Sequence, residues 1–172
     1  NTFLDSSTNN FTITRNGNAT QGSFSPYGSN WSNYFPTAGT NLNVSSSSAF
    51  AFGTGAFTIE FWVYNTNTTT GYCHPAVLTG STQYIQFIRG NTGYSNAIVL
   101  NTSGGLYSSG YVLPKVGEWY HLVWQRDDSG NISFYSNGVR QYTNTGFTYN
   151  FSEDLDVQIG SRSSYEVLGE LS

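Results

Sequence analysis

The stretch from Gly117 to Gly138 constrains the fold more than any other part of this 172-residue chain. Residues 119–124 are all aromatic, aliphatic or histidine, as expected for a strand, and residues 127–130 (Asp-Asp-Ser-Gly) then supply a turn. The β pattern resumes from Ile132 to Tyr135 and ends at Asn137-Gly138, a dipeptide typical of a two-residue hairpin turn. We therefore predict an antiparallel meander in this region.

The rest of the chain indicates an all-β fold. No apolar repeat of helical period lasts for three turns, whereas short apolar runs bounded by Gly, Asn, Ser and Thr recur along the sequence. The predicted strands are residues 11–15, 41–44, 57–64, 76–78, 84–89, 97–101, 106–108, 119–126, 132–136, 139–143 and 157–161. So many short strands predict an antiparallel two-sheet jelly-roll sandwich, with the serine run 45–48 as a loop.

Alternation along residues 57–64 assigns two faces to one strand. Phe57, Ile59, Phe61 and Val63 form an apolar face suited to the gap between two sheets, which is about 10 Å wide. The opposite face (Thr58, Glu60, Trp62 and Tyr64) is too aromatic for open solvent. It is either covered by a loop or exposed as a ligand surface.

Composition excludes several classes of function. Charged residues make up only 9% of the chain and aromatic residues 17%, so the core is aromatic and the surface is rich in Ser, Thr, Asn and Gly. The net charge is −4, and the six Lys and Arg residues are scattered, which disfavours nucleic-acid binding. No apolar run approaches the ~20 residues of a membrane span. Cys73, the single cysteine, has no partner for an intrachain disulfide, and with His74 alone it falls short of a zinc site.

The central hairpin resembles that of the laminin-G-like jelly rolls of the concanavalin A-like lectin/glucanase superfamily. The resemblance lies in Trp119, in His121 two residues later, in the Asp- and Gly-containing turn, and in the aromatic-x-Asn-Gly of residues 135–138. This family mostly binds sugars or proteins. Residues 4–13, 25–27, 31–35, 41–44, 52–60 and 157–161 follow in the order typical of these domains, so the resemblance covers nearly the whole chain.

The sequences of these segments look especially similar to those of domains in virion proteins of marine bacteriophages. Those domains belong to tail fibres, tail-associated proteins or capsid appendages. We expect residues 1–172 to be a single laminin-G-like domain of a longer chain, in which the closing C-terminal strand of the family would follow Gly169-Glu170-Leu171-Ser172.

The superfamily also contains glycoside hydrolases, whose retaining members need two carboxylates about 5–5.5 Å apart. In the sandwich-fold enzymes these lie on one strand face, but Glu60 has Trp62 and Tyr64 where that pattern needs acids. His121 shares a face with Trp119 and Val123, and we place it in or near the core rather than in a catalytic role. No enzymatic activity is expected.

No cofactor is expected, although calcium stays possible because laminin-G-like and pentraxin-like relatives often bind one ion at the sandwich rim. The oxygen ligands that this ion prefers could come from Asp5, Asp127, Asp128, Asp154 and Asp156. The acids do not have a recognisable ligand spacing. An ordinary turn role for each is therefore the preferred interpretation.

Sugar binding would use aromatic rings against the sugar face and polar groups against its hydroxyls. The candidates are Trp31 and Tyr34, the turn residues Arg89, Asn91 and Tyr94, and the pair Tyr107 and Tyr111, which bracket a further loop. Simple packing is the alternative for each of these aromatic residues.

We expect a non-enzymatic module of a phage virion protein that contacts host-surface glycans or neighbouring virion subunits. The alternatives are a secreted bacterial carbohydrate-binding module and a purely structural unit. The expected location is the virion or the extracellular space. Any homo-oligomer is expected to form through regions outside these residues.

Overall fold

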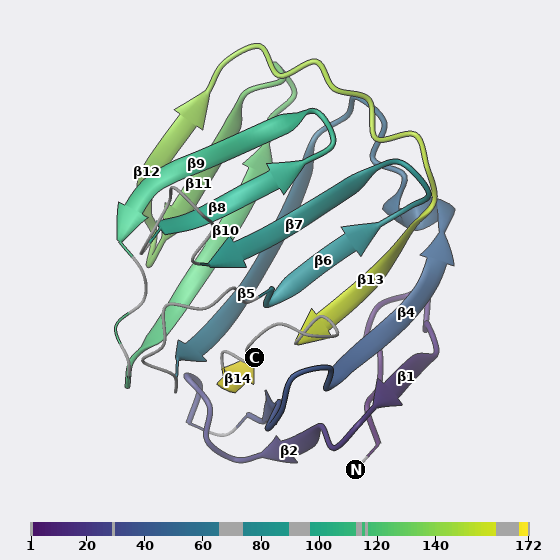
Figure 1. The fold of residues 1–172 in the computed structure, drawn as a ribbon, viewed down its shortest axis with the longest axis vertical. Helices are drawn as coiled ribbons and strands as arrows, with labels where there is room; N and C mark the ends of the chain where they lie inside the picture. The colour runs from purple at the N-terminus through teal and green to yellow at the C-terminus, as the bar shows by residue number, and fades with distance from the viewer. Residues whose placement is uncertain are drawn as a thin grey trace.

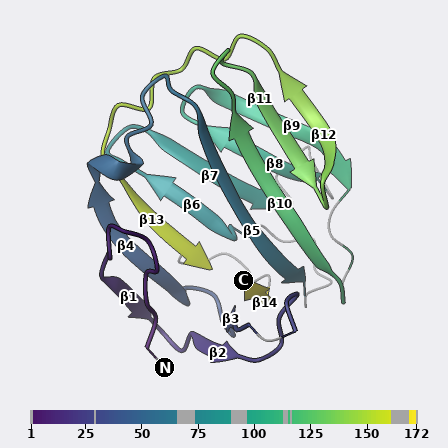
Figure 2. The ribbon, with the colours of Figure 1, turned by 180° about the vertical axis from the view of Figure 1, so that it is seen from behind.

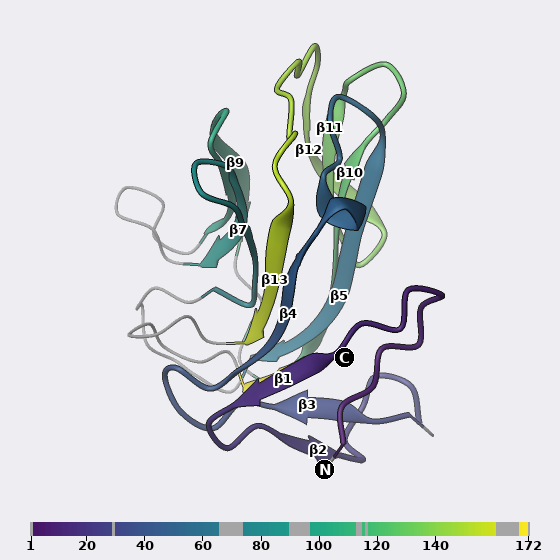
Figure 3. The same ribbon diagram turned by 90° about the vertical axis from the view of Figure 1, so that its right-hand side faces the viewer.

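Two antiparallel sheets face each other in the computed structural model (Figure 1 and Figure 3). The structure describes residues 2–28, 30–65, 74–89, 97–112, 115, 117–160 and 169–171, without the side chains of 65, 89, 97–99, 106–112 and 169–171. The first sheet has the order β1 (Ile13–Asn16), β4 (Asn41–Ser47), β13 (Leu155–Gly160), β6 (Ala76–Thr79), β7 (Tyr84–Arg89), β8 (Ala97–Thr102) and β9 (Gly105–Val112). The second has the order β12 (Val139–Asn144), β11 (Ile132–Ser136), β10 (Trp119–Arg126), β5 (Phe57–Asn65), β14 (Gly169–Leu171), β3 (Ser32–Tyr34) and β2 (Thr20–Gly22). The predicted all-β sandwich is confirmed.

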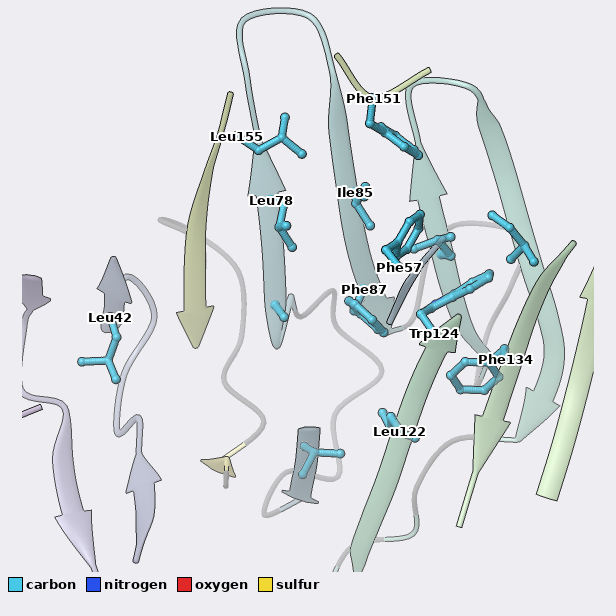
Figure 4. Packing of buried hydrophobic residues seen from close by; sticks show 14 of the residues in the cluster. Leu42, Phe57, Leu78, Ile85, Phe87, Leu122, Trp124, Phe134, Phe151 and Leu155 are labelled. Carbon is cyan, nitrogen blue, oxygen red and sulfur yellow. The ribbon is translucent and has the colours of Figure 1, made fainter. Parts of the chain in front are cut away.

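Side chains from both sheets fill the space between them (Figure 4). The first sheet contributes Leu78, Ile85 and Phe87, and the second contributes Leu122 and Phe134. Full burial of one such side chain stabilises the fold by about 1.5–3 kcal/mol relative to exposure. The apolar face predicted for β5 is confirmed: Phe57 and Val63 are buried, and Ile59 and Phe61 pack against the same core.

The β10–β11–β12 meander also forms as predicted. Asn137 and Gly138 both have positive φ, at 49° and 76°, which is the backbone of the hairpin turn that an Asn-Gly pair favours. Asn137 fastens this turn to β10, because its Oδ1 accepts a hydrogen bond from the His121 N–H at 2.8 Å.

A buried cation lies at the end of β10. Arg126 is only 1% exposed, and its guanidinium donates to the carbonyl oxygens of Gly53, Gly55 and Tyr149 at 2.7–2.8 Å. The rings of Phe57, Phe147 and Phe151 surround it, with centroids 5.0–5.9 Å away. Burial lowers the pKa of Arg126, but an arginine keeps its proton in proteins. The side chain therefore joins three separate segments at one end of the sandwich.

Two local expectations are wrong. The serine run 45–48 is not a loop: β4 continues through Ser47, and the 3-10 helix η1 (Ser48–Phe50) follows, with the Ser47 hydroxyl accepting from the Ala49 N–H. Tyr111 is not in a loop either, because β9 extends from Gly105 to Val112. Both segments carry residues typical of loops, yet strand pairing draws them into the sheet: Ser47 is opposite Leu155 of β13, and β9 pairs with β8.

The short strand β14 lies between β3 and β5, where Leu171 is opposite Val63. Among the described residues, 57–62 of β5 pair with β10 and with no second strand. Val44, Val157 and Ile159 on the inner face of the first sheet are only half-buried and line a groove of about 350 Å³. The closing strand expected after residue 172 stays a prediction.

No helix with the length and apolar character of a membrane span occurs among the described residues.

Replacing the buried cation should destabilise the fold strongly. Arg126→Met removes the guanidinium donors from the carbonyl oxygens of Gly55 and Tyr149 and leaves that of Gly53 with the Phe151 N–H, so we expect the free energy of unfolding to fall by about 3 kcal/mol or more. Urea denaturation measures this loss. The matched control is Arg140→Met, because Arg140 is exposed on β12, and it should change stability by about 0.5 kcal/mol or less. Equal effects of the two substitutions would contradict the role given to Arg126.

Candidate ligand-binding surface

The outer face of the second sheet carries aromatic side chains from its two central strands. The register of β5 with β10 places Tyr64 opposite Trp119 and Trp62 opposite His121. The Tyr64 and Trp119 rings have centroids 5.4 Å apart, and those of Trp62 and His121 stack at 5.0 Å with planes 23° apart. These four rings form a layer on the side of the sheet that faces away from the core.

A second layer comes from the connection between β2 and β3, which lies at the lower end of β5 in Figure 2. Phe24 points its edge at Tyr64, with centroids 4.7 Å apart, and lies 5.5 Å from Trp119. Tyr27 crosses Trp62 at 5.6 Å and accepts a hydrogen bond from the Trp62 Nε1 at 2.5 Å. Phe24 and Tyr27 are each still 48% exposed. We call Phe24, Tyr27, Trp62, Tyr64, Trp119 and His121 the aromatic surface.

Polar groups lie within this surface. The Nε2 of His121 is 3.3 Å from the Oε2 of Glu60, its neighbour on the outer face. The Nε1 of Trp119 is buried and has no hydrogen-bond partner among the described residues. The surface therefore offers apolar rings together with a carboxylate and an imidazole, and it encloses an indole N–H without a partner among the described residues.

The predicted site residue Tyr34 borders the aromatic surface, and the predicted site residue Trp31 is exposed just before β3. Trp31, at the end of the same connection, is 64% exposed. Tyr34 on β3 is 39% exposed, and it is in register with Glu170 of β14, which is opposite Tyr64. The register thus places Tyr34 on the side of the sheet that carries the other exposed rings, and ligand contact by Trp31 stays a prediction.

The position expected for the β10 histidine is wrong. The residues that face the core are Leu122, Trp124 and Arg126, so Trp119, His121 and Val123 lie on the outer face. Both faces of β10 are largely apolar, so alternation separates them without showing which one is inside. The inward face also ends in an arginine, which from sequence alone would be assigned to solvent.

The other predicted sugar-binding residues are not brought to this surface by any described contact. Arg89 ends β7 and Tyr107 and Tyr111 lie in β9, but their side chains are outside the described structure. Asn91 and Tyr94 lie outside the described residues altogether, as does Cys73. Their role stays a prediction.

Two of the acids proposed for calcium accept hydrogen bonds from residues of their own loops. The Asp5 carboxylate accepts from the Ser7 hydroxyl and from the N–H groups of Ser7 and Phe11, and these hydrogen bonds lower its pKa. Asp127 accepts from the side chain and N–H of Asn131 and from the Ser129 N–H, with the same effect on its pKa.

The remaining three acids lie at two separate places. Asp128 is exposed in a turn, Asp154 is exposed directly before β13, and Asp156 is half-buried on β13. The described residues contain no group of three or more His, Cys, Asp or Glu side chains placed to hold a metal ion. Calcium binding by any of the five acids stays a prediction.

Glu153 is a structural carboxylate that the sequence did not reveal. It accepts hydrogen bonds from the hydroxyls of Thr82 and Ser81 and from the N–H groups of Thr82 and Gln83. These contacts, led by that of the Thr82 side chain, lower its pKa to about 2. The partners are 70–72 residues apart in the chain, so no local pattern signals the contact.

The Glu153 contacts predict a pH-dependent contribution to stability. Its folded pKa is below the ordinary value of 4.5, so the stabilisation is complete above that value and is lost as the pH falls toward 2. The melting temperature of the wild type should exceed that of Glu153→Gln at about pH 6, and the difference should shrink by about pH 3. Asp154→Asn is the control, since this exposed neighbour makes none of these contacts. A Glu153→Gln difference that is constant with pH would refute the assignment.

The comparisons with known proteins define the family. The model of the concanavalin A-like lectin/glucanases superfamily matches residues 36–171. The chain belongs to this superfamily. A search of curated protein sequences finds no match.

Solved structures share the fold of this superfamily member. Domain 4 of an extracellular arabinanase from Geobacillus stearothermophilus, solved in complex with arabinotriose, has a TM-score of 0.71 at 18% identity, covering 96% of this chain and 82% of that one. The binding domain of botulinum neurotoxin serotype G has a TM-score of 0.71 at 12% identity, covering 98% and 42%. The binding domain of Paraclostridial Mosquitocidal Protein 1 has a TM-score of 0.72 at 11% identity, covering 98% of this chain and 44% of that one. This chain thus spans less than half of the toxin binding domains, and at such identities the likeness is one of fold.

Proposed function

We propose that this domain is a non-enzymatic carbohydrate-binding module that holds a glycan on the aromatic surface. The observation that carries the proposal is the exposure of Phe24 and Tyr27, each 48%, above the ring layer of β5 and β10. Exposed rings of this kind suit the C–H face of a sugar ring, and nearby polar groups suit its hydroxyls.

The charge arrangement supports binding rather than hydrolysis. Retaining and inverting hydrolases both need a pair of carboxyl groups across the scissile bond. On the aromatic surface the carboxylate of Glu60 pairs instead with the imidazole of His121 at 3.3 Å. This arrangement can fix the orientation of a sugar hydroxyl, but it does not provide the second acid.

The fold comparison also favours a sugar as the ligand. A structural relative that this chain covers over 82% of its length was solved with an oligosaccharide, arabinotriose. That relative is a domain of an extracellular enzyme, which supports a secreted setting for the present domain. Attachment to a phage virion appendage stays a prediction from the sequence resemblance, as does a purely structural role against neighbouring subunits.

Glycan binding and its location can be tested together. The purified domain is screened on a glycan array that includes arabinan oligosaccharides, and hits are titrated by calorimetry. Tyr27→Ala and Trp31→Ala should each weaken binding about 10-fold, because each removes one aromatic contact with the sugar. Val139→Ala is the matched control: Val139 is 61% exposed on β12, at the edge of the same sheet, and its loss should leave the affinity unchanged.

Two results would contradict the proposal. Absence of binding to every glycan by a domain with a normal melting curve would reject the carbohydrate function and favour the structural role. Binding that both aromatic variants retain in full would reject the aromatic surface as its site and direct attention to Tyr94 and its neighbours.

A further inference from the structure

Two tryptophan indole groups are buried without a hydrogen-bond partner among the described residues, those of Trp119 and Trp124. A buried donor without an acceptor costs free energy, so each case needs an explanation. Trp124 is 1% exposed and lies in the core against Phe134, where apolar side chains enclose it permanently. Trp119 lies on the outer face of the sheet, where Phe24 of the β2–β3 connection contacts its ring.

A side chain of this connecting loop, Phe24, packs against the Trp119 ring. The ring centroids of Phe24 and Trp119 are 5.5 Å apart. The Tyr64 ring also contacts Trp119, with centroids 5.4 Å apart. Phe24 itself is 48% exposed, so its outer side faces solvent. A half-exposed ring of the loop thus packs beside the buried Trp119 indole N–H.

The loop contacts the sheet through aromatic ring contacts and one side-chain hydrogen bond. Phe24 meets Tyr64 and Trp119 through ring contacts, and Tyr27 accepts the hydrogen bond from Trp62. The Tyr27 N–H donates to the Ser25 hydroxyl, and the Asn30 N–H donates to the Tyr27 carbonyl, so these bonds lie within the loop. A movement of the loop would leave these internal bonds intact and break mainly the ring contacts.

We propose that Phe24 is a movable cover over a sugar subsite, and that the Trp119 Nε1 donates to a hydroxyl oxygen of the bound sugar once Phe24 moves aside. The floor of this subsite is the continuous ring layer of Tyr64, Trp119, Trp62 and His121. The sugar compensates for the contact that Trp119 loses. The sugar ring replaces the Phe24 ring, and a sugar hydroxyl supplies the hydrogen-bond acceptor that the Trp119 indole lacks. The proposal rests on the carbohydrate-binding function and names a further contact residue within it.

The subsite favours an uncharged sugar. Glu60, 59% exposed, places a carboxylate beside His121 on the floor, and a negative charge here repels carboxylated or sulfated sugars. One hydroxyl can accept from the Trp119 indole, and a different hydroxyl can donate to the Glu60 carboxylate, because Glu60 is opposite Val123, four residues along β10 from Trp119. Opening need only be a minor population of the free protein, which the sugar then stabilises.

Hydrogen exchange of the two indole N–H groups tests the cover without any ligand. In the domain with ¹⁵N-labelled tryptophan, followed by NMR, the Trp119 indole should exchange at least about 100-fold faster than that of Trp124, which opens only with the core. Trp119→Phe and Trp124→Phe assign the two resonances. Phe24→Ala should accelerate exchange at Trp119 alone, and Leu4→Ala, at a residue 75% exposed in the N-terminal segment, should change neither.

Adding arabinotriose, or the neutral oligosaccharide that binds best on the array, tests the donor role. Sugar binding should shift the Trp119 indole resonance and slow the hydrogen exchange of its N–H. The affinity for the sugar should fall about 5-fold in Trp119→Phe, because the variant lacks the donor. Exchange at Trp119 as slow as at Trp124 would overturn the movable cover. A sugar that binds but leaves the Trp119 indole unaffected would overturn the subsite and leave the proposed function standing. No response to any sugar would reject the proposed function and, with it, the subsite.

Discussion

The antiparallel register of β5 with β10 is the constraint on which the rest of the structure depends. It sets Phe57 opposite Arg126 at one end and Tyr64 opposite Trp119 at the other. A slip by one residue would carry every inward side chain to the outer face. Arg126 opposes such a slip, because its guanidinium fits three carbonyl oxygens and three phenylalanine rings at one position only. The same pairing that buries Trp124 therefore holds Trp119 on the outside.

The outer face is unusual for a sandwich because it repeats the aromatic character of the core. Such a face would normally be polar or covered by another element. Here the β2–β3 connection covers it partly, with Phe24 and Tyr27 both packed on the sheet and half-exposed to solvent. A surface that is aromatic and incompletely covered is suited to a ligand with its own apolar face, and a sugar has one.

Alternation in the sequence predicts the inward face of β5, and the Asn-Gly turn predicts the hairpin between β11 and β12. Both predictions rest on local chemistry that the rest of the fold does not override. The inward face of β10 could not be chosen in this way, because Trp119 and His121 look as apolar as Leu122 and Trp124. The covering loop could not be predicted either, since Tyr27 and Trp62 are 35 residues apart and the loop has no periodic pattern. The candidates Trp31 and Tyr34 rest on a local signal, since their rings lie among Asn and Ser, and their ligand contact stays a prediction. Phe24 and Trp119 were missed because nothing in the sequence marks their contact.

The central claim is that this member of the concanavalin A-like lectin/glucanases superfamily binds a glycan on the outer face of its second sheet. A map of backbone amide shifts during titration with arabinotriose and array-selected glycans tests it most directly. We predict that the largest changes fall on residues 23–31 and on the adjoining ends of β5 and β10, from Trp62 to Tyr64 and from Trp119 to His121. Changes confined to the first sheet, or to the turn between β8 and β9, would contradict the account.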